Sequence, residues 1–468
     1  MSNLFLYEDE SVRNLMEQYL TDWIFARQPL KTESDIVVRW GNESAPEMYP
    51  LALNPVHGSQ TARAGRLFRR IMKLSGITTS SQVDEGVEPP WKANPRNLRH
   101  RFQIGVFDMS VIFFREEMAT GAKATSGVRS SEVRRLKELA MRAVYASGLD
   151  FGVVHAGVER KTRELVILGV DPAPRLAANT ALRFAGGMLR YASAINSVKG
   201  KMRSKSLAIG LGADPEFTLA KRDGGRAFAS DYLPVAGSVG CEMQPAQFNG
   251  RSHKPVAELR PNYALSPIRL FNNLKQTVDR ANQLIPPGIV WLAGSVPDGT
   301  FPTGGHIHFS RIPLSTRLLR SLDSYLAAPL LLVEDPARTI IRRPRYGFLG
   351  DIRVKSHGGF EYRTPFSWLH NPVLARGTLC LAYVVAREHL LLTQNLFADP
   401  LYIEAFYAAE KGPFRQRLDA LWADLEGTPS FDTYRKSLSE LRALIDSGWV
   451  VDEGADFRRV WFGEKGRV

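Results

Sequence analysis

The chain is poor in cysteine and histidine. Its 468 residues include only two cysteines, Cys241 and Cys380, and nine histidines. Two cysteines cannot build a disulfide framework, and neither belongs to a paired Cys motif of the kind that holds structural zinc. The scarcity excludes a disulfide-stapled secreted scaffold and predicts a reducing compartment.

Long apolar runs are also missing. No stretch approaches the roughly 18 uncharged apolar residues of a membrane span, and the N-terminal sequence "MSNLFLYEDESVRN" becomes acidic too early for a signal peptide. These absences predict a protein without membrane segments that works in the cytoplasm. A length of 468 residues with 44% hydrophobic composition suits two or three domains with buried cores.

The common catalytic signatures are absent as well. The sequence contains no G-x-x-x-x-G-K-[ST] phosphate loop, no G-x-S-x-G elbow and no H-E-x-x-H motif.

Charge is unbalanced, because 61 Lys and Arg against 48 Asp and Glu give a net charge of +13, which favours a polyanionic partner. The arginines are dispersed and not interleaved with aromatic residues, so nucleic acid is not expected as the main partner.

Composition changes near residue 203. The segment 196–210 begins with a stretch poor in large apolar residues and rich in Lys and Arg, between a helical pattern and an apolar strand pattern. Two domains are therefore expected, 1–202 and 203–468. The first combines strand patterns, such as "DIVVRW" and "FQIGVF", with a helical pattern at 130–147 that has a serine cap. It is predicted to be an α+β domain.

The second domain is predicted to be rich in strands as far as about residue 372 and mostly helical beyond it. Four of its predicted strands carry two ionisable residues at positions i and i+2. These pairs are Asp214 and Glu216, Glu258 and Arg260, His306 and His308, and Glu361 and Arg363. Successive side chains of a strand point to opposite faces, so each pair shares one face. If the strands are neighbours in one antiparallel sheet, one surface gathers carboxylates, imidazoles and guanidiniums.

A surface of this composition restricts the chemistry. Carboxylate oxygens with one or two imidazoles, and no thiolate, suit Mg²⁺ or Mn²⁺. Bare metal ions would repel the arginines, so a bound anion is expected between them. Phosphate fits, because guanidinium binds it bidentately while a divalent metal bridges its oxygens. The pattern is typical of phosphoryl transfer. The alternative for each pair by itself is a solvated strand face.

An arginine-rich segment precedes Glu361. Arg345 and Arg353 bracket the stretch "RYGFLGDIR", which contains two glycines, and we expect both to contact substrate or phosphate. Arg338 and Arg342 fit this interpretation and a solvated loop equally well.

Five motifs occur in a fixed order: "GADPEF", "ELRP", "GGHIHF", "RYGFLGDIR" and "GGFEYRTP". The ordered set resembles the phage-encoded carboxylate–amine ligases, or amidoligases, over about residues 206–385. That family shares its fold with glutamine synthetase and glutamate–cysteine ligase. The resemblance implies an α+β fold in which a curved antiparallel sheet, with flanking helices, holds ATP and two or three Mg²⁺ (or Mn²⁺) ions. It also implies a phage protein in the host cytoplasm.

The resemblance assigns roles position by position. The implied metal ligands are Asp214, Glu216, Glu258, His306 and Glu361. His308 is implied to face the nucleotide phosphates, and Arg345 and Arg363 to bind the nucleotide with it. The implied catalytic arginines, which contact the transferred phosphoryl group or the acyl substrate, are Arg260, Arg345, Arg353 and Arg363.

Two departures from the family pattern stand out. A longer stretch, "GCEMQPAQFNGRSHKP", replaces the expected acidic turn before "ELRP", and its Glu242 is a candidate further metal ligand. The N-terminal domain resembles a shortened ATP-grasp domain in which Gly169 and Asp171 replace the usual Glu and Asn ligands and His155 replaces an acidic residue. The span between "GITTS" and "RHRFQI" is short for the subdomain that grips adenine. The resemblance therefore implies a degenerate domain kept for substrate docking or assembly.

The leading prediction is an ATP- and Mg²⁺-dependent ligase that joins the carboxylate of an amino acid, peptide or protein to an amine through an acyl phosphate. One alternative is a non-catalytic binding or virion-associated protein on a decayed ligase scaffold. Another is a metal-dependent phosphodiesterase or nuclease. The joint presence of carboxylates, histidines and arginines argues against decay, and the Glu361–Arg363 pair argues against a nuclease. The sequence leaves open the two substrates and whether the chain forms a homo-oligomer.

Overall fold

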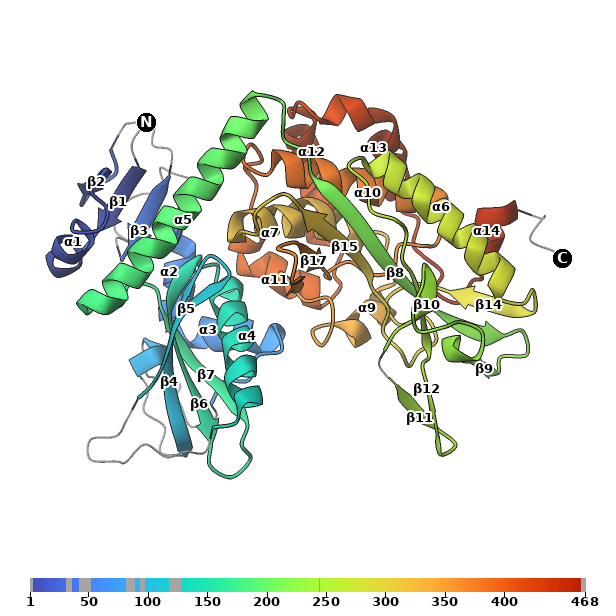
Figure 1. The fold of residues 1–468 in the computed structure, drawn as a ribbon, viewed down its shortest axis with the longest axis horizontal. Helices are drawn as coiled ribbons and strands as arrows, with labels where there is room; N and C mark the ends of the chain where they lie inside the picture. Colours follow the sequence, from blue (N-terminus) through green and yellow to red (C-terminus); the bar gives the residue numbers. More distant parts are fainter. Residues whose placement is uncertain are drawn as a thin grey trace. The chain divides into compact units, whose positions relative to one another are not determined.

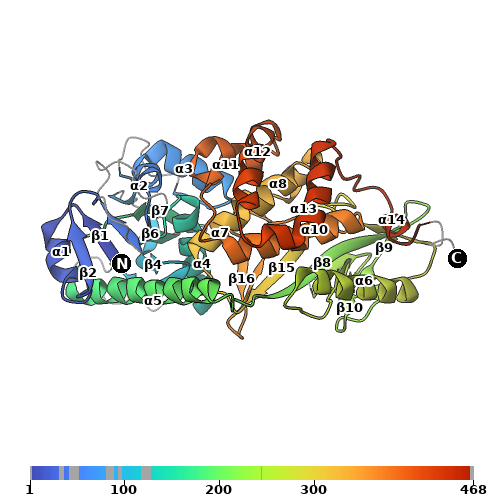
Figure 2. The same ribbon diagram turned by 90° about the horizontal axis from the view of Figure 1, so that it is seen from above.

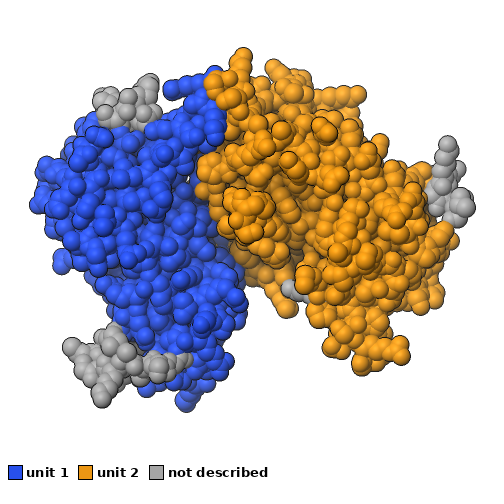
Figure 3. Space-filling model, in the orientation of Figure 1, with its two compact units in different colours: residues 1–203, 315–317, 397–403 blue, residues 204–314, 318–396, 404–468 orange. Residues whose placement is uncertain are grey.

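The computed structural model describes residues 3–30, 36–41, 52–80, 89–92, 97–117, 128–243 and 245–463. The chain divides into two compact units, coloured separately in Figure 3. Unit 1 is Met1–Arg203 with Ser315–Arg317 and Phe397–Ile403, and unit 2 is the remainder. Among the helices of the described part, none has both the length and the apolar character needed to cross a membrane.

Unit 1 contains two sheets (Figure 1). Strand β1 (Asn3–Tyr7) pairs in parallel with β2 (Trp23–Ala26) and β3 (Val37–Trp40). The other sheet is antiparallel, in the order β5-β4-β6-β7, formed by β4 (Leu98–Phe107), β5 (Ser110–Glu116), β6 (Phe151–Glu159) and β7 (Leu165–Asp171). The helices of this unit are α1 (Glu10–Met16), α2 (Val56–Arg63), α3 (Gly65–Leu74), α4 (Ser130–Ala146) and α5 (Ala178–Arg203).

The expected serine cap of the helix at 130–147 is wrong. Helix α4 begins at Ser130, and its N-cap is Arg129, whose side chain cannot accept a hydrogen bond. Instead the Arg129 backbone N–H donates to Glu132 Oε2 at 2.8 Å. A carboxylate in the first turn therefore satisfies this helix end, where the helix dipole also favours negative charge.

Unit 2 is built on an antiparallel sheet of eight strands within the described residues. Its main path runs β10-β13-β8-β15-β17-β16, and β14 and β9 also pair with β8. The strands are β8 (Gly210–Lys221), β9 (Arg226–Ala227), β10 (Val239–Cys241), β13 (Val256–Leu259), β14 (Ile289–Leu292), β15 (Gly305–Ser310), β16 (Ile352–Val354) and β17 (Phe360–Tyr362). A separate hairpin joins β11 (Ala246–Phe248) to β12 (Arg251–His253). The predicted α+β fold with an antiparallel sheet is confirmed.

Helices flank this sheet and continue to the C-terminal end of the described chain (Figure 2). They are α6 (Pro267–Leu284), α7 (Thr316–Leu322), α8 (Ala328–Leu331), α9 (Pro336–Arg342), α10 (Pro372–Glu388), α11 (Pro400–Tyr407), α12 (Gly412–Glu426), α13 (Phe431–Asp446) and α14 (Arg458–Phe462). Helix α10 is buried over nearly its whole length, packed against α6 and α13. An aromatic cluster of Phe217, Trp291 and Phe457 fills the core beside β8.

Candidate active site

Strand register gathers the ionisable pairs on one face of the unit 2 sheet. Residue His306 lies opposite Asp214, and His308 lies opposite Glu361. Glu258 of β13 lies opposite Glu216 on the other side of β8. Strands β13, β8, β15 and β17 are direct neighbours, as the i, i+2 pattern requires if the pairs are to share a surface.

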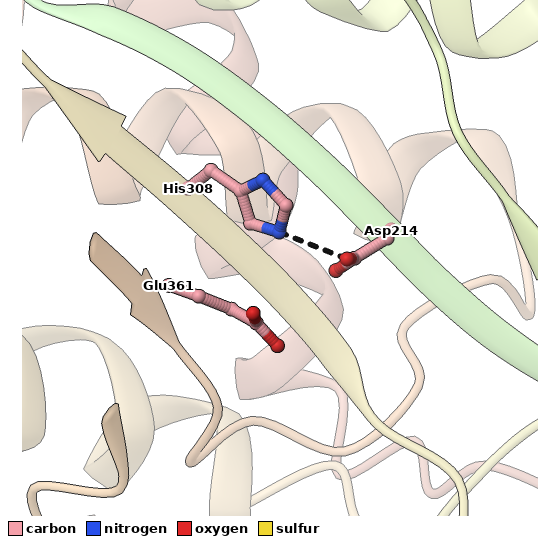
Figure 4. Close-up of side chains that lie close together, drawn as sticks. All are labelled: Asp214, His308 and Glu361. Atoms are coloured by element: carbon pink, nitrogen blue, oxygen red, sulfur yellow. Dashed lines mark ion pairs between the residues drawn. The ribbon is translucent and has the colours of Figure 1, made fainter. Parts of the chain in front are cut away.

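The two histidines lie against carboxylates, and Figure 4 shows the contact of His308 with Asp214. Nε2 of His308 is 2.9 Å from Oδ2 of Asp214. Nδ1 of His306 lies 3.4 Å from both Asp214 Oδ1 and Glu361 Oε1, and 3.9 Å from Glu216 Oε1. Ile307 and Phe309, between and beside them, are buried on the opposite face. The polar alternation of "GGHIHF" therefore builds a cluster and not a solvated face.

The two glycines before the first histidine are explained by close approach. A Cβ at Gly304 would lie 2.3 Å from Nε2 of His306. A Cβ at Gly305 would lie equally close to the ring of Trp368, whose Nε1 donates to the Gly305 carbonyl at 2.9 Å. The Gly304 N–H donates to Glu216 Oε2 at 2.8 Å. Gly304 leaves room for the His306 ring, and Gly305 leaves room for the ring of Trp368.

Three of these side chains have the geometry of a metal site. Ligand atoms of Asp214, His308 and Glu361 all lie within 4.8 Å of one another. Among the described residues, the buried atoms Asp214 Oδ1 and Glu361 Oε1 make no hydrogen bond of good geometry. Buried carboxylate oxygens beside an imidazole fit a divalent cation such as Mg²⁺ or Mn²⁺. His306 and Glu216 border this set.

At the cluster, burial and neighbouring charges shift the pKa values of the side chains in opposite directions. Burial alone raises the pKa of a carboxyl, but the neighbouring His306 and His308 outweigh it and hold the pKa of Asp214 well below its usual range. Burial raises the pKa of Glu216, and nearby Glu242 adds to that effect. For His306 burial lowers the pKa, yet the charge of Glu216 and the contact with Asp214 raise it overall. A cluster of crowded carboxylates in a buried site is the environment in which bound cations are stabilised.

Glu258 and Arg260 form an ion pair at the edge of this face. Burial, followed by repulsion from Asp214, raises the pKa of Glu258 to about 8. Arg260 lies just beyond the end of β13, and its Nη1 donates to the Val235 carbonyl at 3.1 Å. Arg260 is therefore held by Glu258 and by loop carbonyls, directed toward the 235–241 segment.

Among the carboxylates of the cluster, Glu361 has the most basic neighbours. Arg363 Nε lies 3.2 Å from Glu361 Oε1, and Arg353 Nη1 lies 3.6 Å from Oε2. Lys355 also pairs with this carboxylate. Lys355, one residue past the end of β16, was not predicted as a site residue, although its spacing of two from Arg353 is that of the other pairs.

A cavity of about 300 Å³ opens beside the cluster. Its charged lining is Glu216, Glu242, His306, Arg342, Arg345, Asp351 and Arg363. Arg345 is exposed and Arg342 is buried, so the solvated-loop alternative for Arg342 is wrong. The Arg342 guanidinium donates to the carbonyls of Arg363, Thr364 and Pro365 at 2.9–3.1 Å. The cavity thus borders both the acidic cluster and the guanidiniums of Arg345 and Arg363.

In unit 1, Gly169 and His155 lie opposite each other in the β6–β7 pair. Gly169 offers no ligand atom, and burial raises the pKa of Asp171. His155 Nδ1 is 3.4 Å from Glu117 Oε1. Much of the span 81–98, which was judged short for an adenine-gripping subdomain, lies outside the described residues.

Buried carboxylates, imidazoles and guanidiniums gathered beside a cavity are typical of an enzyme that acts on charged groups. Residues 211–462, which contain every side chain of the cluster, match the family model described as "Phage phiEco32-like COOH.NH2 ligase-type 2". The match covers more than half of the chain, and the chain belongs to this family of carboxylate–amine ligases.

Solved structures show weaker likenesses. A bifunctional glutathione synthetase from Pasteurella multocida is 9% identical, with a TM-score of 0.36 over 57% of this chain and 53% of that chain. A structure described as a novel glutamine synthase homolog is 18% identical, with a TM-score of 0.30 over 57% of this chain and 74% of that one. The macrocyclase MdnB from Microcystis aeruginosa MRC is 11% identical, with a TM-score of 0.27 over 40% and 98%.

The chain thus spans about half the length of the glutathione synthetase. Likenesses this weak say nothing about activity. No curated protein sequence matches the chain.

Proposed function

We propose that the protein is an ATP- and Mg²⁺-dependent ligase that activates a carboxylate as an acyl phosphate and transfers the acyl group to an amine. The observation that carries the proposal is the set formed by the buried Asp214 and Glu361 with the half-buried His308, beside the guanidinium of Arg363. Cation ligands and anion-binding groups stand side by side there, and a metal-bound polyphosphate needs both.

The residues of the cluster would have two roles, cation binding and anion binding. Asp214, His308 and Glu361 would hold a divalent cation, with Glu216, Glu258 and His306 as further ligands. That cation would supply neutralisation of phosphate charge when bound. Arg345 and Arg363 at the cavity, with Arg353 and Lys355 beside Glu361, would bind phosphoryl and carboxylate oxygens and keep them in line.

The reaction itself needs no protein nucleophile. A substrate carboxylate oxygen attacks the γ-phosphorus of ATP and ADP leaves. The amine nitrogen then attacks the acyl carbon, and phosphate leaves as the amide forms. Arg363 and Arg345 would stabilise the charge that develops on the transferred group. Arg260 would act by orienting Glu258.

We assign residues 203–468 to the catalytic domain and 1–202 to an ATP-grasp-like domain that has lost its metal ligand at Gly169. The carboxylate would belong to an amino acid, peptide or protein. We further propose a phage origin and action in the host cytoplasm, without nucleic acid or membrane as a partner.

Isothermal titration of ATP with Mg²⁺ tests the proposal. We expect metal-dependent binding by the wild type that a Glu361→Ala, His306→Ala double variant loses. Glu426→Ala, an exposed position in α12, is the matched control and should bind like the wild type. Absence of ATP binding by the wild-type protein overturns the proposal, as does full binding by the double variant. After binding is seen, ADP release with pairs of amines and carboxylates identifies the substrates.

A further inference from the structure

The C-terminal segment 451–457 reaches the neighbourhood of the candidate site through one buried carboxylate. The Trp291 N–H donates a hydrogen bond to Asp456 Oδ1 at 3.1 Å, and the Phe457 N–H donates to the Trp291 carbonyl at the same distance. These bonds hold the segment against β14. Glu453, which is 2% exposed, contacts the loop after β14, residues 294–296, which we call the β14 loop.

Glu453 binds two consecutive backbone groups of the β14 loop. The Ser295 N–H donates to Oε1 of Glu453 at 2.6 Å, and the Val296 N–H donates to Oε2 at 2.9 Å. A Cβ on Gly294 would lie 2.2 Å from the carboxyl carbon of Glu453. The missing side chain at residue 294 therefore makes room for the carboxylate, which fixes the loop at two points.

A gain in stability does not explain this carboxylate. Glu453 forms no ion pair with any described residue, and the charged side chains that act on it, Glu334 and Asp335, are also acidic. Burial of a charge without a partner of opposite sign is costly, even where backbone N–H groups bind it. The geometry that Glu453 imposes on the β14 loop is the better explanation.

The β14 loop holds the residues just before β15 through Thr303. The Thr303 N–H donates to the Ser295 carbonyl at 2.9 Å, and its Oγ1 donates to the Gly294 carbonyl at 2.7 Å. The next residue, Gly304, donates its N–H to Glu216 Oε2 at 2.8 Å. The orientation of the Glu216 carboxylate therefore depends on where the β14 loop holds Thr303 and Gly304.

A second path joins the same loop to the main chain of Glu216. The Ser367 N–H donates to the Gly294 carbonyl at 3.0 Å, and the Ser367 hydroxyl donates to the Glu216 carbonyl. The Glu216 N–H in turn donates to the Gly304 carbonyl at 2.9 Å. Both the side chain and the backbone of Glu216 are thus held from the β14 loop, whose own position Glu453 fixes.

We propose that Glu453 is a positioning residue for the metal centre: it fixes the β14 loop, and the loop orients the Glu216 carboxylate toward a bound divalent cation. This inference rests on the proposed function, in which Glu216 is a further metal ligand. Loss of a group that hydrogen-bonds a ligating side chain typically weakens metal binding about 10–100-fold. Glu453 acts from further away than such a group, so an effect at the lower end of this range is expected.

Titration of Mn²⁺ into the full-length protein, followed by the electron paramagnetic resonance signal of free Mn²⁺, tests the proposal. Glu453→Leu removes both acceptor oxygens at similar volume and should weaken Mn²⁺ binding about tenfold. Glu453→Gln keeps one acceptor and should weaken it about threefold. Leu438→Ala removes a buried side chain of α13 outside this network. It controls for lost stability and should bind Mn²⁺ like the wild type.

A double-mutant cycle with Glu216→Gln tests the path from Glu453 to the cation. The Glu216→Gln, Glu453→Leu double variant should bind Mn²⁺ as Glu216→Gln does by itself, because the carboxylate that Glu453 orients is then gone. Circular dichroism confirms that each variant is folded at the temperature of the titration. If Glu453→Leu does not fold, Glu453→Gln takes its place in the cycle.

Equal Mn²⁺ affinity of the wild type and the Glu453 variants overturns the positioning role, as do independent, additive effects in the cycle. Equally weakened binding by Leu438→Ala also overturns it, since lost stability would then explain the change. Absence of Mn²⁺ binding by the wild type removes the metal-dependent ligase proposal, and this inference with it. Wild-type binding that the Glu453 variants retain in full removes the positioning role alone, so the two failures are distinguishable.

Discussion

At the scale of single residues, Arg342 shows how a buried charge shapes the rim of the cavity. Its side chain is 2% exposed, and burial lowers the pKa of its guanidinium to about 10. It donates to three consecutive carbonyls, those of Arg363, Thr364 and Pro365. The chain that follows β17 is therefore held in the position from which Arg363 reaches Glu361.

Replacement of Arg342 by lysine should expose this role. A lysine ammonium is a point charge and cannot span three carbonyls, so Arg342→Lys leaves buried acceptors unpaired. We expect the free energy of unfolding to fall by about 2–4 kcal/mol. Urea titration measures this change. Arg338→Lys, in the same helix and only partly buried, should cost less than about 1 kcal/mol. Equal losses for the two variants would show that the carbonyl contacts are unimportant.

At the scale of elements, the loop after β14 connects the C-terminal tail to β15, the strand that carries His306 and His308. The buried carboxylate of Glu453 accepts hydrogen bonds from Ser295 N–H at 2.6 Å and Val296 N–H at 2.9 Å. The Gly294 carbonyl accepts from Thr303 Oγ1 at 2.7 Å and from the Ser367 N–H at 3.0 Å. The loop thereby ties the start of β15 and the end of the β17 segment to one point.

Gly294 should not tolerate a side chain. Its φ is +146°, and a Cβ there would lie 2.2 Å from Cδ of Glu453. We expect Gly294→Ala to lower the free energy of unfolding by about 2–4 kcal/mol, through backbone strain and displacement of the Glu453 carboxylate. Gly412→Ala, which meets no atom within 4 Å, is the control and should be neutral or slightly stabilising. Differential scanning calorimetry measures both, and an unshifted transition for Gly294→Ala would refute the account.

At the scale of the whole molecule, stability should depend on pH through groups that fold with displaced pKa values. Burial raises the pKa of Glu453 to about 7, even though its two backbone hydrogen bonds favour the charged form. Between its usual value of 4.5 and about 7 the native chain binds more protons at this group than the unfolded chain does. Glu453 therefore stabilises the folded chain at pH values below that window. This contribution to the free energy of unfolding is lost as the pH rises through the window.

Glu453→Gln removes this titration. The free energy of unfolding of the variant, minus that of the wild type, should increase by up to about 3 kcal/mol between pH 5 and pH 8. Glutamine supplies one acceptor oxygen, so the variant starts lower at acid pH. Calorimetry across this range follows the transition that Gly294→Ala also moves. A difference that is constant with pH would contradict the assignment.

The site residues that could be predicted are those whose signal lies within a short stretch of sequence. Asp214 with Glu216 and His306 with His308 were recognised because strand periodicity puts residues i and i+2 on one face. Lys355 lies on the same face as Arg353 and was missed, since the sequence does not show where its short strand begins. The role of Arg342 was ambiguous in the sequence, because the burial of its side chain depends on which loop covers it. The serine cap was wrong, because the helix already begins at Ser130 and Arg129 is its N-cap, with the N–H of Arg129 donating to Glu132.

The sequence by itself determined the antiparallel, α+β character of the second half, the ionisable pairs and the resemblance to carboxylate–amine ligases. These properties follow from alternation and motif order within short windows. Only the tertiary structure shows that ligand atoms of His308, Asp214 and Glu361 lie within 4.8 Å of one another, and that Glu242 lines the cavity. The physical reason is that distances between strands depend on register and packing, which residues far apart in the chain establish together.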